Sequence, residues 1–193
     1  MHSDGTANFI ADKDIKKIYV ATEKVNLSQN IPSERGERRR RMMPRASRNG
    51  NSQVFAEKTD YGWVIQQQGQ RGCTAATTAM HIMDNGKVPS VQALGHRNLG
   101  NSETMIGDLN RAGLNPMMSN VEKFEELSAL IKKNGPAIIG VNGKEIGGHV
   151  VVLDRLTKTS AIIRDPYHGW CIRMSKEALK EICSLQDIIQ VKR

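Results

Sequence analysis

The chain has 193 residues, with 28 Lys and Arg against 20 Asp and Glu, so its formal net charge is +8. Hydrophobic residues make up 38% of it and charged residues 25%, a balance typical of one packed domain with an additional segment. This composition excludes a collagen-like protein, a coiled-coil array and a wholly disordered chain.

Residues 1–55 are predicted to form a mobile basic arm, and residues 56–193 a single folded domain. The arm contains one strand-like run at 17–20 and is otherwise rich in Asn, Ser, Arg and Lys. The run of Arg38, Arg39, Arg40 and Arg41 is typical of a solvated segment, and it would also attract an anionic surface or an acidic partner. Both interpretations stay open.

Helical patterns follow the arm. An apolar run at 63–65 precedes three predicted helices, at 73–85, 102–112 and 121–134. Apolar residues recur at helical spacing in these segments, and a glycine marks the C-terminal end of each. The first helix has small residues at its start, which would let it pack closely against a sheet.

From residue 137 onward the pattern becomes that of β-strands. Short apolar runs occur at 137–141, 149–154, 160–164, 170–174 and 187–191. Turn residues separate the first four runs, as in an antiparallel meander. A short helix at 175–182, with Ser175 as its cap, precedes the last run. Helices followed by a sheet predict an α+β fold.

The most informative motif is the stretch 66–76 (QQQGQRGCTAA), which places Cys73 in the first turn of a predicted helix. Unsatisfied backbone N–H groups and the positive end of the helix dipole favour a thiolate at that position. Gln67 would reach the same site and donate its amide hydrogens to a developing oxyanion. Three neighbours are equally polar alternatives: Gln66, Gln68 and Gln70.

A thiolate nucleophile needs a base, and His149 is the histidine that begins a strong strand, directly after a pair of glycines. The next predicted strand ends in Asp165. Neighbouring antiparallel strands would bring Asp165 close to His149, where it would hold the imidazole in the useful tautomer. The sequence therefore predicts a triad of Cys73, His149 and Asp165.

Four motifs in this order resemble those of the papain-like cysteine peptidases. They are Gln-x5-Cys at a helix start, Gly-Pro-Ala-Ile-Ile before a strand, Gly-His-Val-Val-Val-Leu, and Ile-x-Asp-Pro-x-x-Gly. Over residues 61–191 the chain is most similar to the family that removes double-glycine leaders from bacteriocins, and to its stand-alone relatives among effectors and toxins. The resemblance implies an N-terminal helical half that carries the cysteine helix, packed on a C-terminal antiparallel sheet that carries the His and the Asp.

The resemblance also implies roles for individual residues. Cys73 would be the nucleophile, His149 the general base, Asp165 the orienting acid and Gln67 the oxyanion glutamine. Substrate contacts are expected from four further residues: Gly72, Gly148, Trp170 and His168. No cofactor and no metal site is predicted, because the sequence contains no metal-ligand cluster and no dinucleotide fingerprint.

These residues imply a thiol protease that cleaves a protein or peptide substrate, and a role as a secreted bacterial effector or toxin. The same triad would serve a glutamine deamidase or an acyltransferase acting on a host protein. A further alternative is a catalytically silent binding module that uses the arginine run.

The sequence also bears on location. No apolar run approaches the roughly 18 residues of a membrane-spanning helix, and the first residues lack the basic and apolar segments of a Sec-type signal peptide. The chain is therefore expected to be cytoplasmic, or exported by a leaderless route into a reducing host cytosol. Cys171 and Cys183 are expected to be core thiols, since three widely spaced cysteines do not form a disulfide framework.

Overall fold

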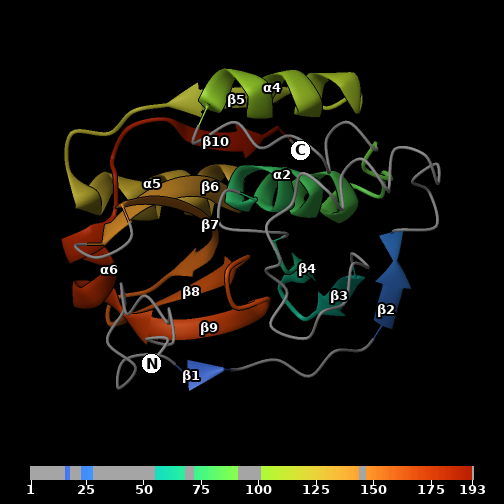
Figure 1. Ribbon diagram of the computed structural model, residues 1–193. Helices are drawn as coiled ribbons and strands as arrows, with labels where there is room; N and C mark the ends of the chain where they lie inside the picture. Colours follow the sequence, from blue (N-terminus) through green and yellow to red (C-terminus); the bar gives the residue numbers. More distant parts are fainter. Residues whose placement is uncertain are drawn as a thin grey trace.

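The computed structural model describes residues 16–17, 23–27, 55–67, 72–90, 101–143 and 147–192. Within these ranges the chain forms a seven-stranded sheet in the order β1-β9-β8-β7-β6-β10-β5 and a three-stranded sheet in the order β2-β3-β4 (Figure 1). Every neighbouring pair of strands is antiparallel.

The bounds of the elements are as follows. The strands are β1 (Lys16–Lys17), β2 (Glu23–Asn26), β3 (Phe55–Thr59), β4 (Gly62–Ile65), β5 (Pro116–Ser119), β6 (Ala137–Gly143), β7 (Gly147–Leu156), β8 (Ser160–Asp165), β9 (Trp170–Ser175) and β10 (Ile188–Val191). The helices are α2 (Cys73–Asp84), α4 (Ser102–Arg111), α5 (Phe124–Asn134) and α6 (Lys176–Ile182).

The large sheet separates two hydrophobic cores. Successive side chains of a strand point to opposite faces, and the apolar residues of β6 and β7 divide accordingly. Ile138, Val150 and Val152 pack in one core with α2, α4 and the three-stranded sheet. Ile139 and Val151 pack in the other core with α5 and α6. The central strands are therefore buried on both faces, which explains their continuous apolar runs.

The predicted α+β architecture is confirmed, and most of its elements lie where the sequence placed them. The cap of α6 is also confirmed, because the Ser175 hydroxyl accepts a hydrogen bond from the backbone N–H of Ala178, 3.1 Å away. The helix expected at 121–134 begins later, at Phe124, because Lys123 has an extended backbone (φ −127°, ψ 142°) and forms the N-cap.

Two features lie outside the predicted pattern. The hairpin of β3 and β4 precedes the first helix, and β5 adds an edge strand beside β10. The sequence of β3 (FAEKT) has little alternation, and β5 (PMMS) is short and begins with proline. Both strands form because tertiary packing outweighs weak local preference.

Two short pieces of the predicted arm, residues 1–55, are paired into the sheets. β1 pairs with β9, β2 pairs with β3, and Leu27 is only 2% exposed in the core beside α2. The division into arm and domain stays a prediction, and the arginine run at 38–41 lies outside the described residues.

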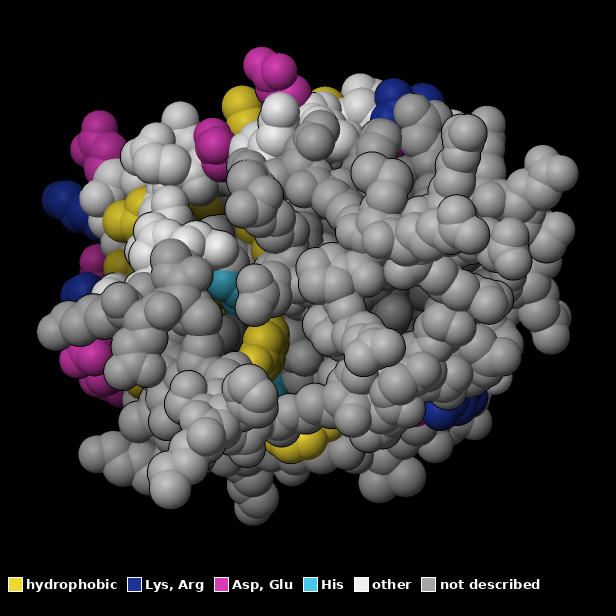
Figure 2. Space-filling model, in the orientation of Figure 1, with side chains coloured by type: hydrophobic (Ala, Val, Ile, Leu, Met, Phe, Trp, Pro, Cys, Tyr) yellow, Lys and Arg dark blue, Asp and Glu magenta, His cyan; other side chains and the backbone are white. Residues whose placement is uncertain are grey.

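The described charged side chains on the face drawn in Figure 2 are mixed in sign, with acidic and basic groups side by side at its left edge. An exposed ion pair joins α6 to α5, where Lys180 Nζ lies 3.0 Å from Glu125 Oε1. None of the helices in the described part of the chain has the length and apolar character needed to cross a membrane.

Candidate active site

Cys73 is the first residue of α2, and Gly72 occupies the N-cap position with no side chain capping the helix. The N-terminal backbone N–H groups of α2 are therefore left for another partner, in a place where the helix dipole favours negative charge. Small residues follow Cys73, and Ala75, Ala76 and Ala79 are buried. The helix can thus lie directly against the sheet, as the sequence predicted.

His149 and Asp165 meet at one end of the large sheet. His149 is near the start of β7, Asp165 ends β8, and His149 Nε2 lies 2.8 Å from Asp165 Oδ1. Both side chains are buried, at 8% and 0% exposed. Since Nε2 is engaged by the carboxylate, Nδ1 is the ring nitrogen that remains for Cys73, which is also a hydrogen-bond partner of His149.

An irregularity in β7 decides that these two residues share a face. The register between β7 and β8 shifts between Leu153 and Arg155, so Asp154 is an extra residue. Beyond the bulge Val152 pairs with Arg164, and by continuation Val151 stands opposite Asp165. Without the extra residue His149 and Asp165 would lie on opposite faces of the sheet, because a one-residue shift inverts the side chains of one strand relative to its neighbour.

The charges of the site support one another. Burial lowers the pKa of His149, but the hydrogen bond to Asp165, the contact with Cys73 and the charges of both outweigh it and raise the pKa to about 9. Burial likewise opposes ionisation of Asp165, yet hydrogen bonds from His149 and His168 hold its pKa well below the usual range. At neutral pH the imidazole of His149 therefore carries a proton and faces an ionised Asp165 carboxylate.

Asp165 also binds the turn that follows it. Its Oδ1 accepts a hydrogen bond from the backbone N–H of Tyr167, 2.9 Å away, and its Oδ2 contacts His168 Nδ1. The His168 ring stacks on Trp170, with ring centroids 5.2 Å apart. His168, which was expected to touch substrate, thus contacts the Asp165 carboxylate, and Trp170, of which the same was expected, stacks on His168.

Gln67 follows β4 and approaches the site from the three-stranded sheet. It is 6% exposed, and its backbone N–H donates to the carbonyl oxygen of Pro166, 2.7 Å away. Gln66 is exposed, whereas Gln68 and Gln70 lie outside the described residues. Gly169 permits this approach, because it has a φ of +67° and an added Cβ would lie 2.9 Å from that of Gln66.

A cleft of about 350 Å³ opens beside the cysteine and the histidine. Among the residues proposed from sequence, Cys73, Gly148 and His149 line it. The others are not part of its described lining: Gln67, Gly72, Asp165, His168 and Trp170. The other walls come from residues that the sequence analysis did not assign to the site. They include α4 (Ser102, Met105), β6 (Ile138, Ile139, Gly140, Asn142), Val150 of β7 and the loop before β10 (Ser184, Gln186, Asp187).

Comparison with solved structures identifies the fold. A double-glycine motif protease from an AMS/PCAT transporter, solved with the leader peptide, is 25% identical with a TM-score of 0.53, over 67% of this chain and 89% of its own. The peptidase domain of Streptococcus ComA, a bifunctional ABC transporter of a quorum-sensing pathway, is 20% identical with a TM-score of 0.58. The match covers 68% of this chain and 98% of that domain. The chain has the fold of the double-glycine peptidases.

A third double-glycine peptidase structure agrees with this assignment. The peptidase domain of Streptococcus mutans ComA, solved with a small-molecule inhibitor, is 19% identical with a TM-score of 0.53, over 67% of this chain and 98% of its own. A scan of protein-family models and a search of curated protein sequences find no match. The resemblance noted in the sequence is confirmed through the fold.

In this double-glycine peptidase fold a buried arginine, Arg164, lies next to the candidate site and links the elements around it. Arg164, the neighbour of Asp165, is fully buried and forms ion pairs of 2.8 Å with both Asp84 of α2 and Asp154 of the bulge. It also donates to the carbonyl oxygen of Trp63, 2.7 Å away. One side chain therefore ties together β4, the C-terminal end of α2 and the β7 bulge.

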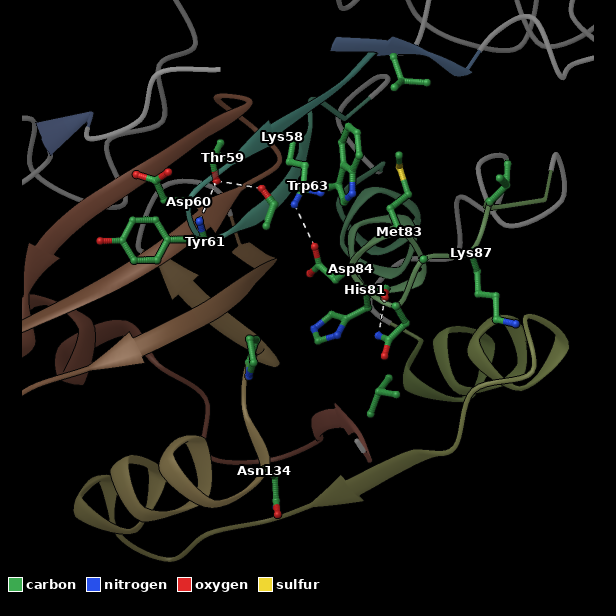
Figure 3. A pocket seen from close by; sticks show the side chains of 17 residues that line it. Lys58, Thr59, Asp60, Tyr61, Trp63, His81, Met83, Asp84, Lys87 and Asn134 are labelled. Atoms are coloured by element: carbon green, nitrogen blue, oxygen red, sulfur yellow. Dashed lines mark hydrogen bonds between the residues drawn. The ribbon is translucent and has the colours of Figure 1, made fainter. Parts of the chain in front are cut away.

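A second, larger cavity of about 650 Å³ lies at the C-terminal end of α2, away from Cys73. Figure 3 shows the His81 ring pointing into it beside Asp84, with Trp63 and Tyr61 on the other walls. Burial lowers the pKa of His81 to about 4, with Arg164 contributing and Asp84 opposing, so its imidazole is neutral at physiological pH. The sequence offered no way to separate this histidine from an exposed one.

The other thiols differ from Cys73 in their surroundings. Cys171 is fully buried in β9, and Cys183 is partly buried after α6. Burial raises the pKa of each thiol to about 12. Within the described residues, no group of three or more His, Cys, Asp and Glu side chains is arranged to hold a metal ion.

Proposed function

We propose that the protein is a cysteine peptidase that cleaves a protein or peptide substrate through Cys73, His149 and Asp165. The observation that carries this proposal is the meeting of the three side chains from separate elements, with His149 held between the carboxylate and the sulfur. In support, the solved structures with this fold are themselves peptidases.

We propose the following reaction for this site. The Cys73 thiolate attacks the carbonyl carbon of the scissile bond, and the negative charge that develops on the oxygen is stabilised by the Cys73 backbone N–H and the Gln67 side-chain amide. His149 then gives its proton to the leaving amine, which leaves an acyl-enzyme thioester. Water, deprotonated by His149, resolves the thioester to a carboxylate and restores the thiolate.

The alternatives within this chemistry differ in their products. A glutamine deamidase would convert a side-chain amide to a carboxylate and leave the chain intact, and an acyltransferase would pass the acyl group to an amine. A catalytically silent module is disfavoured by the assembled Cys, His and Asp, because such a module has no need of all three. The role as a secreted effector or toxin stays a prediction from sequence.

Mass spectrometry of a peptide mixture incubated with the protein tests the proposal. We expect new chain ends with the wild type and none with Cys73→Ala or His149→Ala. The matched control is Cys183→Ala, which removes a thiol that does not line the cleft and should leave cleavage unchanged. Products with intact chains and altered glutamines would instead identify a deamidase, and no product from any substrate would overturn the proposal.

A further inference from the structure

Asp187 is the carboxylate in the wall of the active-site cleft. The described residues that line the cleft are otherwise apolar or neutral and polar, apart from Cys73 and His149 themselves. No described Lys or Arg forms an ion pair with Asp187.

The position of this carboxylate is fixed by three local features. Asp187 has a φ of 54°, in the left-handed region that Asp and Asn adopt more readily than other non-glycine residues. Its backbone N–H donates to Asn120 Oδ1, 2.9 Å away. Its Oδ2 accepts a hydrogen bond from the Ser102 hydroxyl, 2.7 Å away, which leaves Oδ1 for another donor. The carboxylate is therefore exposed but pre-oriented.

A purely structural role at the start of α4 does not account for Asp187. The helix already has its cap, since Asn101 Oδ1 accepts from the backbone N–H groups of Glu103 and Thr104 at 2.9 and 3.2 Å. Glu103 already supplies an acidic residue in the first turn. Asp187 bonds the side chain of Ser102 and no described backbone N–H of α4.

We propose that Asp187 forms a subsite of this cleft for a cationic side chain, Lys or Arg, of the peptide substrate. The proposal rests on the peptidase function proposed above and adds the chemical class of the residue that the cleft accepts. A carboxylate with one oxygen already held by a hydroxyl can take an ammonium or guanidinium group through its other oxygen as a charge-assisted hydrogen bond. The apolar side chains of Met105 and Ile138 would accommodate the aliphatic stem of the same residue.

Peptide vinyl sulfones test the subsite without knowledge of the natural substrate, because Cys73 adds to their electrophilic carbon. In one series, Lys is scanned through the peptide and compared with Nε-acetyllysine, norleucine and Glu at the same position. The second-order rate of Cys73 labelling is measured by mass spectrometry. For the wild type we expect Lys to exceed acetyllysine by about tenfold or more at one position, as for a hydrogen bond to a charged group.

Variants of Asp187 locate the effect. Asp187→Asn keeps the size and the tolerance of a left-handed backbone but removes the charge, and it should reduce the preference to about twofold or less. Asp187→Lys should invert it in favour of the Glu peptide. Asp60→Asn is the matched control, since it removes the same charge from an exposed turn that lines the other cavity, and the preference should persist. Ser102→Ala keeps the carboxylate and should retain a weakened preference.

The possible failures are distinguishable. Equal labelling by charged and neutral peptides in the wild type, or a Lys preference that survives in Asp187→Asn, would overturn the subsite while leaving the peptidase intact. If no peptide reagent of any charge labels Cys73, the proposed function itself fails. The comparison of peptides within the wild type needs no variant, so poor folding of Asp187→Asn would not prevent the test.

Discussion

His149 Nε2 lies 2.8 Å from Asp165 Oδ1 because the bulge at Asp154 turns both side chains to the same face of the sheet. Asp154 also binds Arg164 through both of its carboxylate oxygens, at 2.8 and 2.9 Å. Asp154, which sets the register, is thus held by Arg164, the residue that precedes Asp165. Catalytic alignment and the internal ion pairs of the fold are coupled at this point.

The protonated state of His149 should make Cys73 the fastest-reacting thiol in the chain. With iodoacetamide at neutral pH, we expect Cys73 to be alkylated well ahead of Cys171 and Cys183, whose pKa burial raises to about 12. His149→Ala should remove most of this lead. Peptide mass spectrometry measures all three sites in one sample, and equal rates for the three thiols would contradict the prediction.

Replacement of Asp165 should act through His149. Asp165→Asn keeps the shape of the side chain but removes the charge that supports the imidazolium, so the pKa of His149 should fall from about 9 toward 6.5. Peptide cleavage should decrease by about 100-fold or more. An NMR titration of the His149 ring measures the pKa shift independently of activity. An unchanged titration would show that Asp165 does not act on His149.

His81 should weaken the folded state in acid. Its pKa is about 4 in the folded chain against 6.5 when unfolded, so the unfolded chain binds the extra proton. Stability is therefore full above pH 6.5 and decreases as the pH falls toward 4, by on the order of 3 kcal/mol. Urea unfolding across this window should show a smaller decrease for His81→Phe. A parallel pH dependence in both proteins would assign the acid sensitivity to other groups.

His149 should produce the opposite dependence in alkali. Its pKa is raised from 6.5 to about 9 on folding, so its contribution to stability is present below pH 6.5 and is lost as the pH rises toward 9. In His149→Ala this alkaline decrease should be absent, although the protein is less stable at neutral pH. Asp165→Asn should reduce the decrease by lowering the folded pKa, and urea midpoints at several pH values compare all three proteins.

Loss of Arg164 should be severe because it leaves two carboxylates without their cation in or near the core. Arg164→Met should lower the free energy of unfolding by about 3–5 kcal/mol, the range for breaking a buried ion pair from one side. The matched control is Lys180→Met, which removes the exposed ion pair with Glu125. That change should have little effect, since solvent screens the pair. Similar urea midpoints for the two variants would contradict the structural role of Arg164.

The sequence by itself determined the fold class, the helix that begins at Cys73, and the strands that carry His149 and Asp165. Each of these rests on local preference: small residues behind a helix start, β-branched runs, and turn residues between strands. The sequence also placed His149 and Asp165 on neighbouring strands of a meander with a short turn. The N-terminal hairpin of β3 and β4 did not follow, because its strands are stabilised mainly by long-range packing.

Only the tertiary structure decided which side chains face one another. The extra residue in β7 puts His149 on the same face of the sheet as Asp165, yet nothing in the local sequence distinguishes Asp154 from an ordinary strand residue. Asp187 and Ser102 are far apart in the chain and meet only because the loop before β10 packs on the start of α4. The register of β7 against β8 and the packing of the loop before β10 both depend on the free energy of the whole fold. These two features decide which side chains line the cleft.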